Sequence, residues 1–160
     1  MSLDKVFSIY ESPVGPLLLS GDPRALTGLQ FAERASVPES WTRDDGRFSG
    51  ERRQLREYFA GRRTTFELPL ALEGNLFEQR VWAALQTIPY GTTTTYGELA
   101  AQLGAPDAAR AVGAANGSNP IAIVVPCHRV IGARGKLTGY GGGLDRKRAL
   151  LAHEGAILPV

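Results

Sequence analysis

The sequence predicts an α+β protein in two parts. Residues 1–74 are expected to form a small N-terminal α/β domain with an antiparallel sheet, and residues 75–160 a mainly helical C-terminal domain with a helix-turn-helix. Residues 5–33 alternate short apolar runs with Pro, Gly and Asp turns, which is typical of antiparallel strands. After Gly74 the apolar residues adopt helical spacing behind capping residues, and two short helices follow with a glycine between them.

The N-terminal part contains one further helix and one further candidate strand. In residues 50–61, Leu55, Tyr58 and Phe59 have helical spacing before Gly61, and residues 65–72, "TFELPLAL", could form another strand. This half shows no cluster of polar groups suited to chemistry. We therefore interpret it as a scaffold.

The C-terminal part begins with a capped helix. Asn75 can cap it with Glu78 three residues later, and Pro89 and Gly91 end it. Its apolar stripe is formed by Phe77, Val81, Ala84, Leu85 and Ile88.

Two short helices follow this first one. Thr95 and Glu98 suggest a capping box for a helix through about Leu103, which Gly104 ends. Pro106 and Asp107 can open a second helix that ends near residues 116–117. The pair predicts a helix-turn-helix.

The second helix of this pair carries almost no large side chains. Its small residues are Ala108, Ala109, Ala111, Gly113, Ala114 and Ala115, and Arg110 is its one long group. Such a helix can approach another backbone closely, either a neighbouring helix or a nucleic-acid groove. It lacks the polar groups that read bases in the major groove. If it binds DNA, shape and backbone contacts should dominate, with Arg110 filling a gap in the base stack.

Composition narrows the protein classes further. The net charge of +2 is too small to indicate a nucleic-acid partner by itself. Residues 75–160 carry 8 Lys and Arg against 5 Asp and Glu, a balance of +3, so a polyanion would prefer this half of the chain. A single cysteine excludes an internal disulfide and disfavours a structural zinc site, which favours a reducing intracellular setting. Neither a signal peptide nor a membrane-spanning stretch is expected.

The single cysteine lies in "VVPCHRVIG", residues 124–132. Residues 121–125, "IAIVV", predict a buried strand that Pro126 stops, so Cys127 and His128 would emerge at its end. Cys127 is either a small buried hydrophobic residue or a nucleophile whose pKa a histidine lowers. Glu154, near the end of the last helix, is a candidate partner for His128, although His153 and Glu154 could equally form a solvated helix end.

Adjacent side chains in an extended segment point to opposite faces. Direct contact between Cys127 and His128 therefore needs a bend, and we expect a water to relay the proton instead. Residues 132–147 form a glycine-rich loop with Tyr140, which could wrap a flat ligand or be a simple hairpin. It lacks the ending of a nucleotide-phosphate loop.

Four segments together resemble a known family. They are "FEQRVWAALQTIPYGTTTTYGELA", "RAVGAANGSNPIAIVVPCHRV", "VPCHRVIG" and "TGYGGGLDRKRALLAHEG". They are similar to the O6-alkylguanine-DNA alkyltransferases, the methylated-DNA-protein-cysteine methyltransferases, over residues 76–155. "SPVGPLLLS" and "LREYFAG" are more weakly similar. The resemblance implies the two-part fold already described.

The resemblance also implies a role for each matching residue. Cys127 corresponds to the alkyl acceptor, and His128 to its activating base, which acts through a water and is held by Glu154. Asn119 resembles a hinge asparagine that braces the turn before the active-site segment, and Arg110 the arginine that enters the base stack.

Tyr96 resembles the tyrosine that helps to rotate the nucleotide and supplies a proton near guanine N3, and Tyr140 resembles a wall of the guanine pocket. The DNA-contacting residues are expected to be Thr95, Tyr96, Ala109, Arg110, Ala111, Gly113, Ala114 and Asn116. The pocket is expected to be lined by Pro126, Val130, Tyr140 and Gly141.

This sequence also departs from the family. Where some members carry serines around the active-site loop, it has Ala133, Arg134 and Gly141, so hydrogen bonds to O6 would come from backbone N–H groups. The glycines predict a roomier pocket that accepts alkyl groups larger than methyl.

The resemblance implies single-turnover transfer of an alkyl group from flipped O6-alkylguanine to Cys127, with no cofactor and no metal. The partner would be double-stranded DNA bound through the minor groove by a cytoplasmic monomer. The alternatives are a lesion-binding protein without catalysis, a transcriptional helix-turn-helix protein and a Cys-His hydrolase. The presence of Cys127 disfavours the first, and the small-residue helix disfavours the second.

Overall fold

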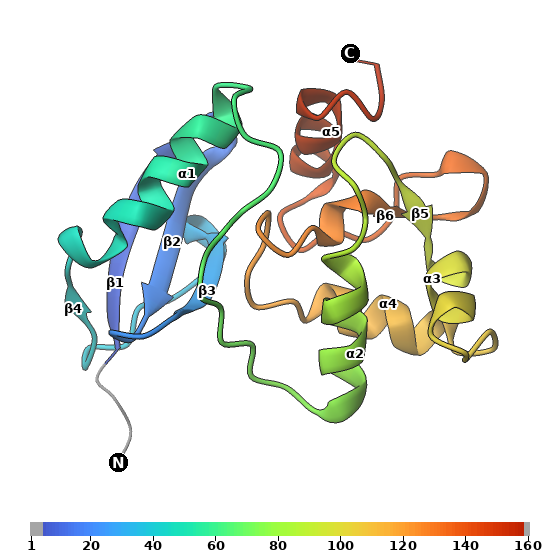
Figure 1. The fold of residues 1–160 in the computed structure, drawn as a ribbon, viewed down its shortest axis with the longest axis horizontal. Coiled ribbons are helices and arrows are strands. Elements are labelled where there is room, and N and C mark those ends of the chain that lie inside the picture. The colour runs from blue at the N-terminus through green and yellow to red at the C-terminus, as the bar shows by residue number, and fades with distance from the viewer. Residues whose placement is uncertain (1–4, 159–160) are drawn as a thin grey trace. The chain divides into compact units, whose positions relative to one another are not determined.

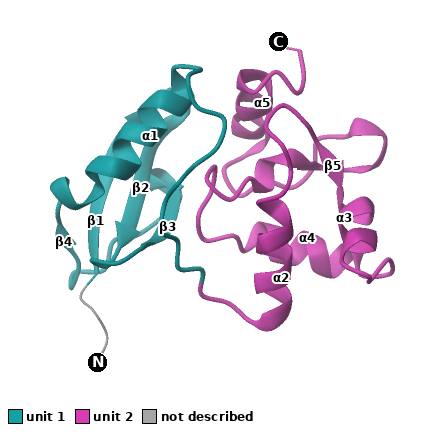
Figure 2. Ribbon diagram, in the orientation of Figure 1, with its two compact units in different colours: residues 1–72 teal, residues 73–160 magenta. Residues whose placement is uncertain are grey.

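The computed structural model describes residues 5–158, which divide between residues 72 and 73 into two compact units, here called unit 1 and unit 2 (Figure 2). The division falls two residues before the boundary expected from the sequence. No helix within residues 5–158 is long and apolar enough to cross a membrane.

Unit 1 is built on a four-stranded sheet in the order β3-β2-β1-β4 (Figure 1). Its strands are β1 (Val6–Ser12), β2 (Gly15–Gly21), β3 (Leu26–Phe31) and β4 (Thr42–Arg43). The first three pair antiparallel as predicted, and the short β4 pairs parallel with β1. Gly15 has a φ of 104°, which allows the tight turn from β1 into β2.

Helix α1 (Ser49–Phe59) lies along this sheet and closes the core of unit 1 (Figure 1). Short 3-10 turns at Ala32–Arg34 and Gly46–Phe48 precede it. Leu17, Leu19, Leu29, Leu55 and Tyr58 are almost completely buried in this core. Alternation along the strands and helical spacing along α1 therefore bring their apolar faces together.

The strand predicted over residues 65–72 is reduced to a single bridge between Leu26 and Leu70. The Leu26 amide donates to the Pro69 carbonyl at 2.9 Å, and the Ala71 amide donates to the Leu26 carbonyl at 2.9 Å. Pro69 has no N–H to extend the ladder, which is why the prediction of a strand was wrong.

Unit 2 is mainly helical, with one short parallel strand pair in which Thr94 faces Val130 and Thr95 faces Ile131. Its elements are α2 (Leu76–Leu85), β5 (Thr94–Thr95), α3 (Tyr96–Gln102), α4 (Ala109–Gly117), β6 (Val130–Ile131) and α5 (Leu144–His153). Two 3-10 turns lie at Cys127–Arg129 and Ala133–Gly135. The α+β class predicted from the sequence is confirmed.

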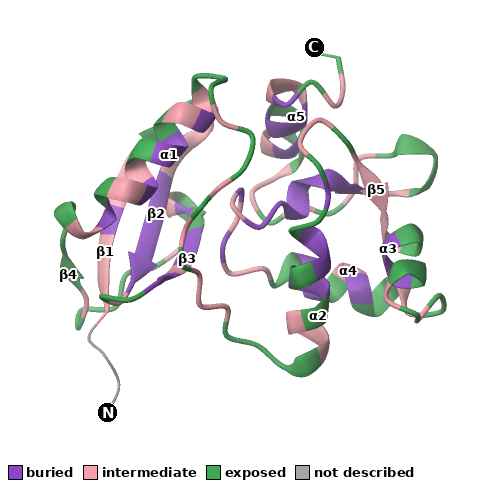
Figure 3. Ribbon diagram, viewed as in Figure 1, coloured by how far each residue is buried: buried purple, intermediate pink, exposed green. Residues whose placement is uncertain are grey.

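Helix α2 buries one face, with Val81, Trp82, Ala84 and Leu85, in the core of unit 2 (Figure 3). The Asn75 side chain accepts from the Glu78 amide and the Glu78 carboxylate accepts from the Asn75 amide, which confirms the predicted capping box. Trp82 is buried, and its indole N–H donates to the Ala115 carbonyl at 2.9 Å, so α2 holds the C-terminal end of α4. A Cβ at Gly74 would lie 2.4 Å from the Trp82 ring, so only glycine fits there.

Helices α3 and α4 form the predicted helix-turn-helix, with two local differences. The Thr95 hydroxyl accepts from the Glu98 amide, but the Glu98 carboxylate accepts from the Thr94 hydroxyl, so the capping box is only half formed. Gly104, with a φ of 75°, follows α3 as expected. Helix α4 begins at Ala109 and not at Pro106, because the Ala108 amide donates to the Ala105 carbonyl in a separate turn.

Residues 121–125 form a buried turn, so the predicted strand was wrong. The Val125 amide donates to the Ile121 carbonyl at 3.0 Å, and Ile123 has a φ of 71°, both of which are incompatible with an extended strand. Ile121, Ile123 and Val125 are nevertheless buried. An apolar β-branched run signals burial as much as extension, so composition alone could not separate the two structures.

Candidate active site

Asn119 holds the buried turn that leads to the cysteine. Its side-chain N–H donates to the Val125 carbonyl at 2.7 Å, and its side-chain carbonyl accepts from the Ile121 amide at 3.0 Å. One amide side chain thus bridges both ends of the turn and fixes the backbone that enters Cys127. These two hydrogen bonds are the contacts that a bracing role for Asn119 requires.

Cys127 is the first residue of a 3-10 turn, and only 7% of its surface is exposed. The Asn116 side-chain N–H donates to the Cys127 carbonyl at 3.3 Å. Asn116 is itself 3% exposed, so it supports the active-site backbone from inside and does not face DNA as predicted. Its place on the inner face of α4, with Val112 and Ala115, explains the correction.

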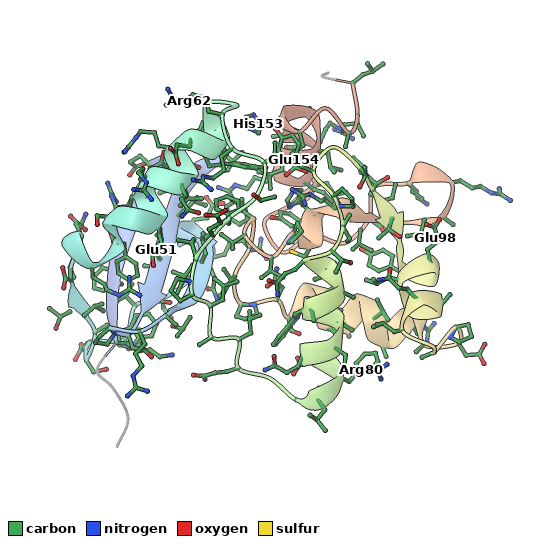
Figure 4. The ribbon with its side chains drawn as sticks, in the orientation of Figure 1. Glu51, Arg62, Arg80, Glu98, His153 and Glu154 are labelled. Atoms are coloured by element: carbon green, nitrogen blue, oxygen red, sulfur yellow. The ribbon has the colours of Figure 1, made fainter. Side chains whose placement is uncertain are left out.

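The next two residues both bind Glu154, which lies at the C-terminal end of α5 (Figure 4). His128 Nε2 donates to Glu154 Oε2 at 2.8 Å, and both side chains are buried. Arg129 Nε donates to Glu154 Oε1 at 2.8 Å, and Arg129 also donates to the Ile88 carbonyl at 2.7 Å. Glu154 is therefore a buried carboxylate that accepts hydrogen bonds from both His128 and Arg129, and it is no part of a solvated helix end. The neighbouring His153 is only half-buried.

His128 is arranged as a neutral base. Burial lowers its pKa below the ordinary value of 6.5, and the Glu154 carboxylate opposes this shift. With the Nε2 hydrogen directed at Glu154, Nδ1 carries the free lone pair, and within residues 5–158 no protein group bonds to it. This nitrogen can accept a proton.

The Cys127 thiol stays protonated in the resting protein. Burial raises its pKa, while a hydrogen bond from the Asn119 side chain and the positive charge of Lys147 oppose the rise. The expectation of a lowered pKa at rest is therefore wrong, because the cost of removing a thiolate from water exceeds the help of these two partners. To act as a nucleophile, this thiol would first have to lose its proton to a base.

Lys147 is a buried cation that we did not single out from the sequence. Its ammonium group donates to the Val130 carbonyl at 2.6 Å and to the Thr138 carbonyl at 2.7 Å. Burial lowers its pKa to about 8, and the interaction with Cys127 raises it. A signal was present: Lys147, Leu150, Leu151 and Glu154 fall at positions i, i+3, i+4 and i+7 of one helix, which places the lysine on the buried face.

Arg129 was also missed, although it directly follows His128. Its role depends on the Glu154 carboxylate 25 residues away, and local spacing carried no signal for that contact. Arg129 therefore became visible as a member of the buried charged network only in the folded chain.

Two tyrosines lie close enough to Cys127 for their charges to interact. Burial raises the pKa of Tyr96, whose hydroxyl donates to the Thr138 carbonyl at 3.3 Å. Burial raises the pKa of Tyr140 well above its ordinary value, and a Cys127 thiolate would raise it further. Both phenols remain protonated at neutral pH, so each can donate a hydrogen bond.

The remaining predicted pocket residues differ in exposure. Pro126 and Val130, which lie close to Cys127 in the sequence, are both buried. The Val130 carbonyl accepts a hydrogen bond from the Lys147 ammonium group. Gly141 is exposed in the loop after Tyr140. The Val130 side chain therefore belongs to the core, and only the strand's backbone faces Lys147.

The outer face of α4 is small and exposed. Arg110, Ala111 and Ala114 are exposed, and Ala109 and Gly113 are half-buried. A Cβ at Gly113 would lie 3.8 Å from the Tyr96 ring, so the start of α3 packs closely beside α4. Thr95 is half-buried and caps α3. The structure thus places all of the predicted DNA-contacting residues along the helix-turn-helix or at its start, and of these only Asn116 is buried.

Comparison with known proteins gives concordant results. Residues 76–156 match the family model described as 6-O-methylguanine DNA methyltransferase, DNA binding domain. Residues 5–72 match the model described as 6-O-methylguanine DNA methyltransferase, ribonuclease-like domain. Together the two models span nearly all of the described chain.

Two named relatives match this chain over almost the full length of both proteins. The methylated-DNA–protein-cysteine methyltransferase of Mycobacterium tuberculosis is 60% identical over 155 residues, 96% of this chain and 94% of the relative. That of Methanosarcina acetivorans is 53% identical over 153 residues, 94% of this chain and 98% of the relative.

A solved structure extends the likeness to three dimensions. The crystal structure of Mycobacterium tuberculosis OGT in complex with DNA is similar with a TM-score of 0.90 and 60% identity, over 94% of this chain and 93% of that one. The agreement of both domain models, the named relatives and this structure shows that the chain belongs to the methylated-DNA–protein-cysteine methyltransferase family.

Proposed function

We propose that this protein repairs O6-alkylguanine in double-stranded DNA by transferring the alkyl group irreversibly to its own Cys127. The observation that carries the proposal is the buried cysteine followed by a histidine whose Nε2 is held by Glu154 at 2.8 Å. The named relatives and the likeness to a DNA-bound structure support the same conclusion.

DNA recognition is assigned to the helix-turn-helix. Helix α4 presents small residues outward, so its backbone can approach the minor groove closely, and the single long side chain is that of Arg110. Because the target oxygen lies inside the duplex, the nucleotide must leave the stack at a cost of a few kcal/mol. Arg110 would occupy the space left by the guanine, with Tyr96 helping to rotate the nucleotide.

The transfer begins with removal of the thiol proton. His128 Nδ1 accepts it through a water, and Glu154 stabilises the resulting imidazolium. The Cys127 sulfur then forms a bond to the alkyl carbon as the bond between that carbon and O6 breaks. The guanine retains the electron pair, and the Tyr96 hydroxyl supplies the proton that neutralises it, to be replaced later from solvent. Tyr140 would form a wall of the guanine pocket.

The product is a thioether on a buried cysteine. No step of this scheme regenerates the thiol, so each molecule should act once. The reaction needs no cofactor, and we propose that the protein acts as a cytoplasmic monomer, where a reducing environment keeps Cys127 as a thiol.

The decisive experiment is intact-mass measurement and peptide mapping after incubation with a duplex that contains one O6-methylguanine. We expect one CH2 unit on Cys127, no more than one per molecule, and no gain in the Cys127→Ser variant. Tight binding without a mass change would instead make this a lesion-binding protein. Continued product release beyond one equivalent would make it a hydrolase.

A further inference from the structure

The loop between β6 and α5 carries two exposed cations at its tip, Arg134 and Lys136, on either side of Gly135. Arg134 has a φ of 62° and a ψ of 28°, a left-handed conformation that side chains other than glycine rarely adopt. It is one of two such non-glycine residues among those described, and the other, Ile123, is buried. Arg134 therefore stands out as a strained and exposed arginine.

The strain at Arg134 comes from a tight turn. The Gly132 amide donates to the Lys136 carbonyl at 2.7 Å, and the Lys136 amide donates to the Ala133 carbonyl at 3.4 Å. Glycine would adopt the conformation of Arg134 without strain, as Gly135 does next to it with a φ of 76°. Strained residues concentrate where a side chain has a task, so the arginine points to a function for its cation.

The tip is anchored beside the helix-turn-helix. Strand β6, which leads into the loop, pairs with β5 directly before α3, and the Tyr96 hydroxyl of α3 donates to the Thr138 carbonyl of the loop. Lys147 donates to the same carbonyl from α5. The loop thus runs past β5 on the side of α3 (Figure 1), fixed from two directions.

The charge of this segment is uniformly positive. Residues 130–144 contain Arg134 and Lys136 and no Asp or Glu. Among residues 5–158, no carboxylate forms an ion pair with either cation, and the ion pairs of unit 2 join Glu154 to His128 and Arg129. Two exposed cations on a braced turn form a suitable cradle for a phosphodiester, because Arg recognises phosphate geometry and Lys adds a point charge.

We propose that Arg134 and Lys136 bind the phosphate backbone of the duplex whose damaged nucleotide enters the site, next to the strand bound by α3 and α4. The inference rests on the proposed function and adds a second, loop-borne contact to it. Such contacts carry no sequence information. They set the register of the protein on the DNA and make affinity depend on salt.

The test variant is Arg134→Gly, because glycine removes the cation and accepts the backbone conformation. We expect its melting temperature to be at least that of the wild type. Its affinity for an O6-methylguanine duplex should fall about tenfold at low salt, and the slope of log K against log salt should be shallower by about 0.9. Lys136→Ala should reduce the slope by a similar amount.

Two controls separate a phosphate contact from other effects. Arg134→Lys keeps the charge and should retain most of the affinity and slope. Arg148→Ala removes an exposed arginine from α5 and should leave both near the wild-type values. The loss should also be confined to duplex DNA, since free O6-benzylguanine has no phosphate.

An unchanged salt slope in Arg134→Gly would overturn the inference. So would an equal loss in Arg148→Ala, which would show a mere effect of net charge, or an equal loss in Arg134→Lys, which would show that the cation is not what matters. None of these results would affect alkylation of Cys127 by the wild type. If the wild-type protein failed to become alkylated on Cys127, the proposed function itself would be contradicted.

Discussion

His128 Nε2 lies 2.8 Å from Glu154 Oε2, although the two residues are 26 positions apart. Arg129 binds the same carboxylate through its Nε and Nη2 atoms at 2.8 and 3.0 Å. The carboxylate thus orients the proposed base and neutralises a buried guanidinium at once. Chemistry and stability depend on one side chain, and they can be separated by substitution.

Replacement of Glu154 should impair both properties. In Glu154→Gln the imidazolium loses its counter-charge and Arg129 becomes an unpaired buried cation. We expect alkylation of Cys127 to slow by about a hundredfold or more and the unfolding free energy to fall by about 3–5 kcal/mol. Single-turnover kinetics and chemical denaturation would measure the two effects.

Arg129→Met is the informative comparison, because it keeps the His128–Glu154 bond. The variant should have a lower unfolding free energy than the wild type. Its folded fraction should still alkylate Cys127 at close to the wild-type rate. If the pH profile of alkylation is unchanged in Glu154→Gln, Glu154 has no part in the mechanism.

Acid should weaken both the fold and the reaction through His128. Its folded pKa is lowered below 6.5, so the unfolded chain binds more protons between that pKa and 6.5. Its contribution to stability is complete above about pH 6.5 and is lost as the pH falls through the folded pKa. The alkylation rate should fall in the same range, because protonated His128 cannot accept the thiol proton.

The second histidine offers a matched control for this prediction. His153→Gln should keep the acid dependence of melting temperature between pH 7 and 5, whereas His128→Gln should flatten it. Equal slopes in the two variants would show that some other group causes the acid dependence.

Removal of the Lys147 ammonium should slow alkylation in a pH-dependent way. Its pKa is about 8, so the cation that favours a Cys127 thiolate is present below pH 8 and is lost above it. Lys147→Met should react about tenfold more slowly than the wild type at pH 7, because the thiolate loses the nearby cation that lowers the thiol pKa. The two rates should converge toward pH 9.5.

Rates with a simple thiol reagent and with O6-benzylguanine would both test this prediction. Arg148→Met, an exposed change on the same helix, should match the wild type throughout. A rate ratio for Lys147→Met that stays constant with pH would assign Lys147 to loop structure alone.

Arg110 should matter for the duplex and not for the chemical step. Arg110→Ala leaves the space vacated by the flipped guanine empty, so repair of an O6-methylguanine duplex should slow by about ten- to a hundredfold. Reaction with the free base O6-benzylguanine should stay within about twofold. An equal loss on both substrates would contradict the assigned role.

The glycine-rich loop predicts tolerance of large alkyl groups. Gly139, Gly141, Gly142 and Gly143 surround Tyr140, and Gly141 is exposed. We expect transfer from O6-benzylguanine at a rate within about tenfold of that from the free O6-methyl base, since added apolar area in an open pocket costs little. Good methyl transfer without benzyl transfer would refute this prediction.

The sequence was most informative where the signal is local. The cap formed by Asn75 and Glu78, the positive-φ Gly104 that follows the end of α3 and the antiparallel strands of residues 6–31 all depend on neighbours a few positions apart. Two predicted strands failed for different reasons. Pro69 cannot extend a ladder, and residues 121–125 are buried in a turn that the distant Asn119 side chain stabilises.

The sequence by itself determined the fold class, the family and the identity of the proposed nucleophile, because these are encoded in spacing and motif. Only the tertiary structure decided the electrostatics around Cys127. It brought Glu154 to His128 and Arg129, directed Lys147 at two carbonyls, turned Asn116 inward and buried the thiol so that its pKa rises. Charge pairing depends on groups that meet only in the folded chain, so no local pattern specifies which groups pair.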